Sequence, residues 1–205
     1  MIELPRNSSV LPGAPASRRH FARVLLALAA ALALGPLAGA RRGAAQEAFP
    51  EYQVKAALLV NFAMFVEWPA GAFPQPEEPL VIGVVGRDPF GKDLERAFAG
   101  KIIRNRRVEI RYFALGAALE SCHLLYLAPG ERRPQRELLL RLKQRPVLTV
   151  GEGEDFLDQG GVIQMTVSRD HNVKFAVNLD AAKPAQLKFS AGLLKLASKV
   201  RGRYD

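Results

Sequence analysis

Cysteine is almost absent from this chain, which has only Cys122 among its 205 residues. One molecule therefore cannot form an internal disulfide, and a small fold stabilised by disulfides is excluded. Cys122 begins an apolar run and is interpreted as a buried, inert thiol. A redox role, through an intermolecular disulfide or a reactive thiol, is the alternative.

Histidine is nearly as scarce. There are three, and His20 lies in a segment that we expect to be removed. His123 and His171 are far apart and have no partner at the spacing of a zinc site. Cys122 and His123 are neighbours on an expected strand, so their side chains point to opposite faces and do not form a nucleophile–base pair.

Motifs that bind phosphate or calcium are also missing. Gly83, Gly86 and Gly91 have neither dinucleotide-binding nor phosphate-loop spacing. The four acidic residues within residues 152–158 lack the spacing of an EF-hand, so a solvated loop is favoured over a calcium site. We predict no metal, no cofactor and no catalytic residues, which argues against an enzyme.

What is present at the start is an export signal. A basic segment, an apolar run over residues 24–34 and a small-residue site at residues 38–40 predict a cleaved signal peptide over residues 1–40. An uncleaved membrane anchor is the alternative. Arg18 and Arg19, followed by Phe21, also resemble a twin-arginine signal.

The remainder divides into a flexible lead, residues 41–50, and one domain, residues 51–205. The whole chain carries a formal charge of +9. Because the protein is expected outside the inner membrane, this charge argues little for nucleic acid, and we predict no nucleic-acid partner. A soluble surface rich in arginine is favoured over a surface that binds anionic lipid.

The chain is organised around residues 52–69, which contain its only tryptophan. Val54, Leu58, Phe62 and Phe65 share one face of the predicted helix. The other faces are also apolar, so we expect burial on more than one side and a helix end at Pro69.

The rest of the chain alternates strands and helices. The continuous apolar run of residues 80–86 predicts a central parallel strand, and Asp88 is expected to cap the next helix. We expect further strands over residues 108–113, 122–128, 146–151, 162–168 and 172–179, and helices over residues 131–143 and 189–200. These predict a single three-layer αβα domain of the α/β class, with a mostly parallel, doubly wound sheet and an antiparallel C-terminal hairpin at its edge.

Five segments, in one order, resemble the YfiR-like family of periplasmic regulators. The first, residues 52–69, reads YQVKAALLVNFAMFVEWP. The others are residues 81–91, 122–126, 146–151 and 178–197. The resemblance implies the same α/β fold and a non-enzymatic regulator in the periplasm. Many members look to use cysteine pairs, and this sequence departs from that pattern.

The resemblance also implies partners. Family members bind the periplasmic part of an inner-membrane diguanylate cyclase and repress it, which lowers cyclic-di-GMP signalling and biofilm formation. An outer-membrane lipoprotein with a peptidoglycan-binding domain sequesters the regulator, and a homodimer is expected. A periplasmic small-molecule binding protein is the alternative, because doubly wound sheets bind ligands at the carboxyl ends of their strands.

Candidate partner or ligand contacts follow from residue type and position. Trp68 and Glu67 are either core residues or part of a partner surface, where tryptophan often carries binding energy. Asn61 is polar within an apolar helix and needs a hydrogen-bond partner if buried. Arg87 and Asp88 follow the expected central strand and lie where a ligand would bind.

Overall fold

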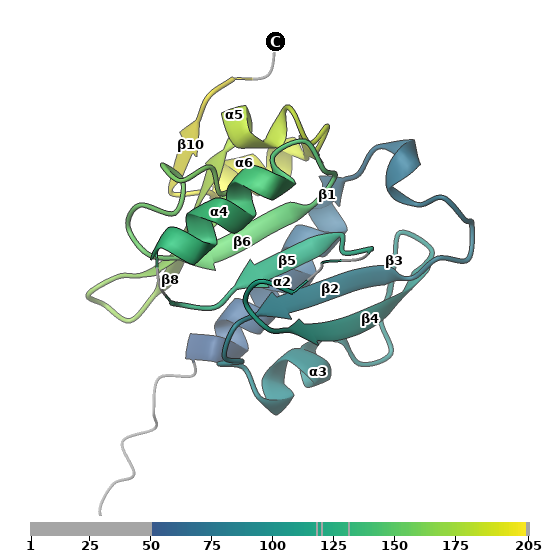
Figure 1. The fold of residues 1–205 in the computed structure, drawn as a ribbon. Coiled ribbons are helices and arrows are strands. Elements are labelled where there is room, and N and C mark those ends of the chain that lie inside the picture. Colours follow the sequence, from purple (N-terminus) through teal and green to yellow (C-terminus); the bar gives the residue numbers. More distant parts are fainter. Residues whose placement is uncertain (1–50, 118, 120, 131, 204–205) are drawn as a thin grey trace, which may run out of the picture. The chain divides into compact units, whose positions relative to one another are not determined.

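The computed structural model describes residues 51–203, except residues 118, 120 and 131. The predicted signal peptide and lead lie outside this part. Most of the described strands form one sheet in the order β10-β8-β7-β6-β5-β2-β4-β3, and β1 pairs antiparallel with β9 in a second, small sheet (Figure 1). No helix of the described residues is long and apolar enough to cross a membrane.

The centre of the large sheet confirms the sequence prediction of parallel pairing. The strand β2 (Leu80–Val85) is buried throughout and pairs parallel with β4 (Arg106–Phe113) and β5 (Leu124–Leu127). Next to β5 lie β6 (Leu148–Glu152) and β7 (Ile163–Val167), both parallel. The structure therefore has a mixed α/β architecture with a mostly parallel sheet.

The long helix α2 (Glu51–Phe65) differs from its prediction in two ways. It ends at Phe65 rather than near Pro69, because β1 (Val66–Glu67) pairs with β9 (Lys188–Phe189). It is also buried on one face only, since Val54 and Phe65 are 37% and 44% exposed. The buried face consists of Lys55, Ala56, Leu59, Val60, Phe62 and Ala63.

The segment after β2 corrects the predicted cap. The helix α3 (Lys92–Phe98) begins at Lys92 with Gly91 as its N-cap, so Asp88 does not cap it. The carboxylate of Asp88 accepts the backbone N–H groups of Phe90 and Gly91 at 2.9 and 3.0 Å and closes a turn before the helix. After α3, the short strand β3 (Ile102–Ile103) returns antiparallel along the start of β4.

The C-terminal part corrects two further predictions. β8 (Val173–Asn178) pairs antiparallel with β7, as expected, but β10 (Lys199–Arg201) pairs parallel with β8 and forms the outer edge. The hairpin is therefore not at the edge. The last helix is α6 (Ala191–Leu196), so Lys199 and Arg201 belong to a strand rather than to a helix end. The helices α4 (Arg132–Leu142) and α5 (Leu179–Ala182) complete the described fold.

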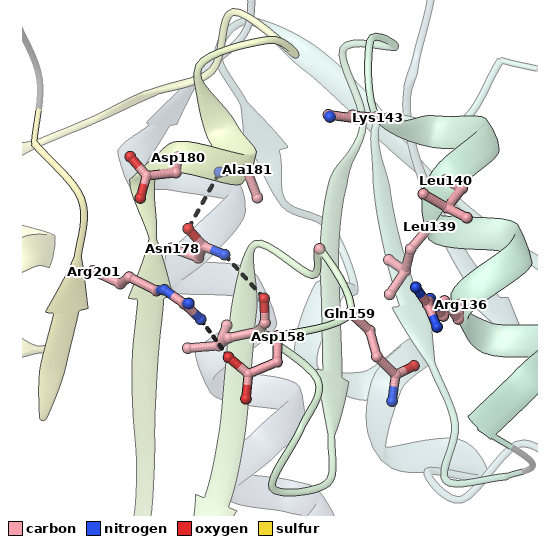
Figure 2. Close-up of a pocket in the computed structure, with 12 residues that line it drawn as sticks. Arg136, Leu139, Leu140, Lys143, Asp158, Gln159, Asn178, Asp180, Ala181 and Arg201 are labelled. Carbon is pink, nitrogen blue, oxygen red and sulfur yellow. Dashed lines mark hydrogen bonds and ion pairs between the residues drawn. The ribbon is translucent and has the colours of Figure 1, made fainter.

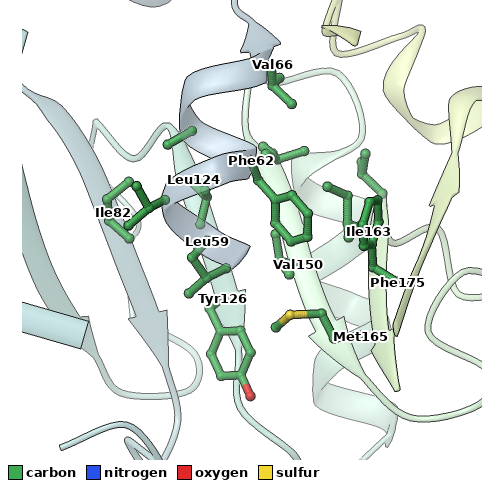
Figure 3. Close-up of a cluster of buried hydrophobic side chains, with 14 of the residues drawn as sticks. Leu59, Phe62, Val66, Ile82, Leu124, Tyr126, Val150, Ile163, Met165 and Phe175 are labelled. Carbon is green, nitrogen blue, oxygen red and sulfur yellow. The ribbon is translucent and has the colours of Figure 1, made fainter. Parts of the chain in front are cut away.

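Buried apolar side chains form two clusters on the two faces of the sheet. The larger one joins α2 to the sheet, and Figure 3 shows Phe62 and Leu59 of the helix meeting side chains from several strands, including Phe175 and Leu124. The smaller one joins α4 to the other face through residues such as Leu138 and Leu139. The sheet therefore fixes the helix α2, which carries the candidate residue Asn61.

Candidate functional site

A buried charged cluster lies where the start of α2 meets the carboxyl ends of the parallel strands. The side chain of Lys55 is fully buried, and its ammonium lies 2.7 Å from a carboxylate oxygen of Glu152, the last residue of β6. The same ammonium pairs with Glu51 one turn earlier and lies 4.5 Å from the ring centre of Tyr52. The hydroxyl of Tyr126, on β5, donates to the other oxygen of Glu152.

The electrostatics of this cluster favour a charged lysine. Burial opposes the ammonium, but its hydrogen bonds to Glu152 and Glu51 outweigh that effect, so the pKa of Lys55 is raised. Burial, followed by the charge of Glu152, raises the pKa of Tyr126. A charged lysine and a neutral tyrosine are poor proton donors and acceptors near neutral pH. The cluster therefore joins helix to sheet rather than resembling an acid–base site.

At the other end of α2, Trp68 belongs to an aromatic stack. Its indole N–H donates to the carbonyl oxygen of His123 at 3.0 Å, and its ring meets that of Phe73 edge-on. The ring of Phe73 stacks on His123 with 4.2 Å between ring centres. The guanidinium of Arg106 lies over the ring of Phe73, 4.0 Å from the ring centre. Trp68 is half-buried, and its polar atom is satisfied within the fold.

The imidazole of His123 is held as one neutral tautomer. Its Nδ1 accepts the N–H of Val81 at 3.0 Å, so Nε2 carries the proton and donates to the carbonyl of Ala72 at 3.0 Å. Burial is the largest cause that lowers the pKa of His123. A second proton would place an N–H of the ring against the N–H of Val81.

We therefore expect acid to destabilise the protein through His123. Because the pKa of His123 is lower in the folded state, its contribution is complete above about pH 6.5 and falls as the pH drops below that value. Denaturant unfolding between pH 7.5 and 5 measures this loss. The variant His123→Gln keeps an acceptor and a donor, and its stability should fall less steeply; equal slopes for the two proteins would contradict the assignment.

The remaining candidate residues do not form one site. Asn61 is exposed on the outside of α2. Glu67 is also exposed and lies 3.6 Å from the guanidinium of Arg104, which also donates to the carbonyl of Val66. Arg87 and Asp88 follow β2 at the carboxyl ends of the strands. Trp68, by contrast, contacts His123 at the amino end of β5, so the candidates lie at opposite ends of the sheet.

Hollows in the surface occur at several places. Arg87 lines one of about 170 Å³ at the carboxyl end of β2. A larger one, of about 330 Å³, lies between α4 and the strands β8 and β10 (Figure 2). Its floor includes Leu139 and Leu157, and its rim holds an ion pair between Arg201 and Asp158.

Metal-binding geometry is not found within the described residues, where no three histidine, cysteine, aspartate or glutamate side chains lie together as ligands. The thiol of Cys122 is 5% exposed and donates to the carbonyl of Leu124 at 3.1 Å. Burial raises its pKa to about 12, so the thiol is protonated at neutral pH. These properties favour the inert interpretation over the redox one.

Comparison with known proteins identifies the family. The model of the YfiR/HmsC-like family (DUF4154) matches residues 52–198, which is most of the chain. The chain belongs to the YfiR/HmsC-like family. No curated protein matches it. The predicted resemblance is thereby confirmed, and family membership indicates a periplasmic regulator of diguanylate cyclase signalling.

The YfiR/HmsC-like match includes residues that the sequence alone did not single out. Lys55, Tyr126 and Glu152 were not predicted as a cluster, and Phe73 was not predicted to stack on His123. One signal was available, since Lys55 is a charged residue within an apolar helix and needs a buried partner. The sequence does not say which of its many carboxylates provides that partner.

Proposed function

We propose that this protein binds the periplasmic part of an inner-membrane diguanylate cyclase and holds the cyclase inactive. Cyclic-di-GMP production and biofilm formation fall as a result. An outer-membrane lipoprotein with a peptidoglycan-binding domain sequesters the protein and lifts the repression. The protein acts as a homodimer and catalyses no reaction. Family membership supports this proposal, and the observation that carries it is the apolar outside of α2.

The outside of α2 has the composition of a docking surface. We call the residues Gln53, Val54, Ala57, Leu58, Asn61, Met64 and Phe65 the outer α2 face. Met64 is 49% exposed and Phe65 is 44% exposed. A helix that faces water normally carries charged residues on its outer side, whereas the outer α2 face has none. A contiguous exposed apolar surface is typical of a site that binds another protein.

Repression of this kind needs no chemistry in the binding protein. It is sufficient that the outer α2 face binds the inactive conformation of the cyclase more tightly than the active one. A coupling of 1–3 kcal/mol, in order of magnitude, changes the balance between two such states by about 5- to 150-fold. The nucleotide itself is made in the cytoplasm, so this protein does not contact it.

The test uses substitutions on the outer α2 face. We expect Met64→Ser with Phe65→Ser to raise cellular cyclic-di-GMP to the level of the deletion strain, because apolar contacts with the cyclase are lost. Both side chains are about half exposed, so the fold should be retained. Cyclic-di-GMP is measured in cell extracts, together with the amount of the protein.

The matched control is Leu140→Ser, which changes an apolar residue that is 60% exposed on α4. This variant should repress as the wild type does. The proposal fails if the double variant represses fully, or if deletion of the gene leaves cyclic-di-GMP unchanged across growth conditions.

Small-molecule binding is the second candidate, supported by the hollow in Figure 2. Its volume of about 330 Å³ is within the range of ligand pockets. Arg136 and Lys143 give the lining positive charge, whereas Arg201 is paired with Asp158 and the lining also contains Asp180. A ligand with an anionic group for Arg136 and an apolar part matches this lining. Thermal stabilisation of the wild type by such ligands, lost in Arg136→Ala, would favour this candidate.

A further inference from the structure

The imidazole of His123 is covered by a short segment, residues 70–74, which we call the cover. The ring of Phe73 stacks on the imidazole with 4.2 Å between ring centres and an angle of 10° between the ring planes. His123 is only 2% exposed, whereas Gly71 and Pro74 of the cover lie at the surface. The cover therefore separates the imidazole from water.

The cover is held by side chains and by one short turn rather than by strand pairing. Nε2 of His123 donates to the carbonyl of Ala72 at 3.0 Å, next to the stacked ring of Phe73. Residues 70–72 form the short 3-10 helix η1, and no described strand includes any residue of the cover. A segment with so little backbone pairing opens at a lower free energy than the sheet beneath it.

The closed cover leaves no place for a second proton on His123. Nδ1 accepts the N–H of Val81 at 3.0 Å, and a protonated Nδ1 would meet that N–H in place of an acceptor. Neither backbone can move away easily, because the N–H of His123 donates to the carbonyl of Val81 at 3.0 Å and the carbonyl of His123 accepts the N–H of Leu148 at 2.8 Å. An imidazolium would thus be a buried charge with an unsatisfied donor, which is costly.

The charges around the ring act in both directions. Glu78, from the loop after the cover, favours an imidazolium, whereas Arg106 and Arg111, from β4, oppose it. The imidazole occupies one face of the Phe73 ring, so the guanidinium of Arg106, 4.0 Å from the ring centre, lies over the other face. The start of β2 and the residue after β1 face the imidazole with uncharged groups. Burial and the missing acceptor therefore decide that His123 is neutral while the cover is closed.

We propose that residues 70–74 form an acid-released cover, which opens when His123 is protonated and uncovers the ring of Trp68. With Phe73 displaced, the imidazolium turns away from Val81, and both of its N–H groups donate to water. Trp68 then loses its edge-on contact with the Phe73 ring. Histidine is the side chain that most often gives proteins such a response between pH 5 and 8.

The released tryptophan lies beside the surface assigned to the cyclase. Trp68 follows Phe65, the last residue of the outer α2 face, by three positions. Tryptophan is a residue type that often anchors protein interfaces. Acid therefore changes which aromatic surface is available next to the outer α2 face. This inference goes beyond the proposed function and does not depend on it.

Contacts on either side confine the opening to a short stretch. The guanidinium of Arg106 donates to the carbonyls of Gln75, Pro76 and Glu78 at 3.2, 2.9 and 2.6 Å, so the chain after the cover stays attached to β4. Before the cover, β1 stays paired with β9. We therefore expect a local release of the cover rather than unfolding of the domain.

The size of the effect follows from linkage. Once it is uncovered and in contact with water, His123 takes the ordinary pKa of histidine, about 6.5. Because the closed form binds the proton more weakly, lowering the pH from 7.5 to 5.0 raises the ratio of released to closed molecules by up to about 30-fold.

The proton affinity of His123 tests the coupling. Imidazole resonances of the full chain are titrated by NMR, and His123→Gln identifies the His123 signal by its loss. In Phe73→Ala no ring covers the imidazole, so we expect His123 to bind its proton several-fold more tightly than in the wild type. Gly71→Ala is the matched control within the cover, because a Cβ atom there meets nothing within 4 Å, and it should leave the titration unchanged.

Trp68, the only tryptophan of the chain, reports the release itself. Quenching of its fluorescence by acrylamide is measured at pH 7.5 and 5.0, with far-UV circular dichroism on the same samples. We expect stronger quenching at pH 5.0 with an unchanged dichroism spectrum, and no such change in His123→Gln. This measurement on the wild type decides the question even if Phe73→Ala fails to fold.

Two results would overturn the inference. One is an identical titration of His123 with and without the Phe73 ring. The other is quenching at pH 5.0 that keeps its neutral value, rises equally in His123→Gln, or rises only together with loss of secondary structure. The purified protein is measured without a partner, so a negative result here differs from a failure of repression in cells.

Discussion

Replacing Lys55 with methionine should lower the free energy of unfolding by about 3 kcal/mol, at the low end of the range for breaking a buried ion pair. Methionine has nearly the length of lysine, so the helix α2 loses little packing. The carboxylate of Glu152, however, keeps only the hydroxyl of Tyr126 as a partner within the cluster. A carboxylate that is largely withdrawn from water and has no cation beside it is costly.

A double variant separates the effect of leaving a charge unpaired from the effect of changed side-chain packing. Lys55→Met combined with Glu152→Gln removes both charges, and Tyr126 can still donate to the new amide oxygen. We expect this double variant to recover about half of the lost stability, because no unpaired carboxylate remains. Lys143→Met is the matched control, since Lys143 is exposed directly after the end of α4; the stability of this variant should differ from the wild type by less than about 0.5 kcal/mol.

Alkaline pH gives an independent measure of the same contact. The pKa of Lys55 is raised in the folded state, so its contribution is complete below about pH 10.5 and is lost as the pH rises through the folded value. The pKa values of Tyr52 and Tyr126 are also raised, so both tyrosines likewise contribute stability that is lost as the pH rises. Denaturant unfolding from pH 8 to 11 should therefore show a steeper fall for the wild type than for Lys55→Met. Identical slopes would show that Lys55 is not paired in the folded protein.

The sequence predicted the centre of the sheet well for a physical reason. A strand covered on both faces needs apolar residues at every position, and residues 80–86 form such a run. β2 is accordingly buried throughout and has a parallel neighbour on each side. Similar reasoning identified β5 and β6, which lie beside it. Continuous hydrophobicity is informative because few other structures require it.

The buried side of α2 could not be predicted by the same reasoning. Both sides of this helix are apolar, so periodicity does not distinguish the face that meets the sheet from the face that meets a partner. The sequence pattern grouped Val54 and Phe65 on one face with Phe62 and predicted burial on more than one side, whereas the structure exposes both Val54 and Phe65. The ambiguity is itself a consequence of function if the outer α2 face binds another protein.

The secondary structure of the C-terminal part was harder to predict from the sequence, for a different reason. Residues 189–200 have a helical pattern of apolar positions, yet residues 199–201 form the strand β10. The side of β8 away from β7 offers unpaired backbone groups, and pairing with them outweighs a weak local preference for helix. The charged cluster could not be predicted from the sequence either, because Lys55 and Glu152 are far apart in sequence and only the fold brings them together.

The loop between β6 and β7 contains a second contact of large expected effect. The ring of Phe156 is 1% exposed and lies between two glycines. A Cβ atom at Gly151 would lie 2.3 Å from one edge of the ring, and a Cβ atom at Gly161 would lie 2.2 Å from the other. Neither glycine has a positive φ, so lack of space rather than backbone conformation requires glycine at both positions.

Gly161→Ala should therefore lower the free energy of unfolding by about 3 kcal/mol, at the upper end of the range for overpacking. Phe156 cannot move away from Gly161, because Gly151 closes the opposite side of the ring. Gly71→Ala is the matched control, since a Cβ atom there meets nothing within 4 Å, and we expect almost no change. Denaturant unfolding at neutral pH measures both variants.

Shortening the ring should compensate for the added methyl group. Phe156→Leu alone leaves a cavity and is expected to cost about 1–2 kcal/mol, but in the Gly161→Ala protein it also removes the clash. The double variant should consequently be more stable than the sum of the two single effects predicts, with a coupling of at least about 1 kcal/mol. Simple additivity would mean that the ring does not occupy the space between the two glycines. The loop that follows Glu152, the last residue of β6, would then need another explanation for its position.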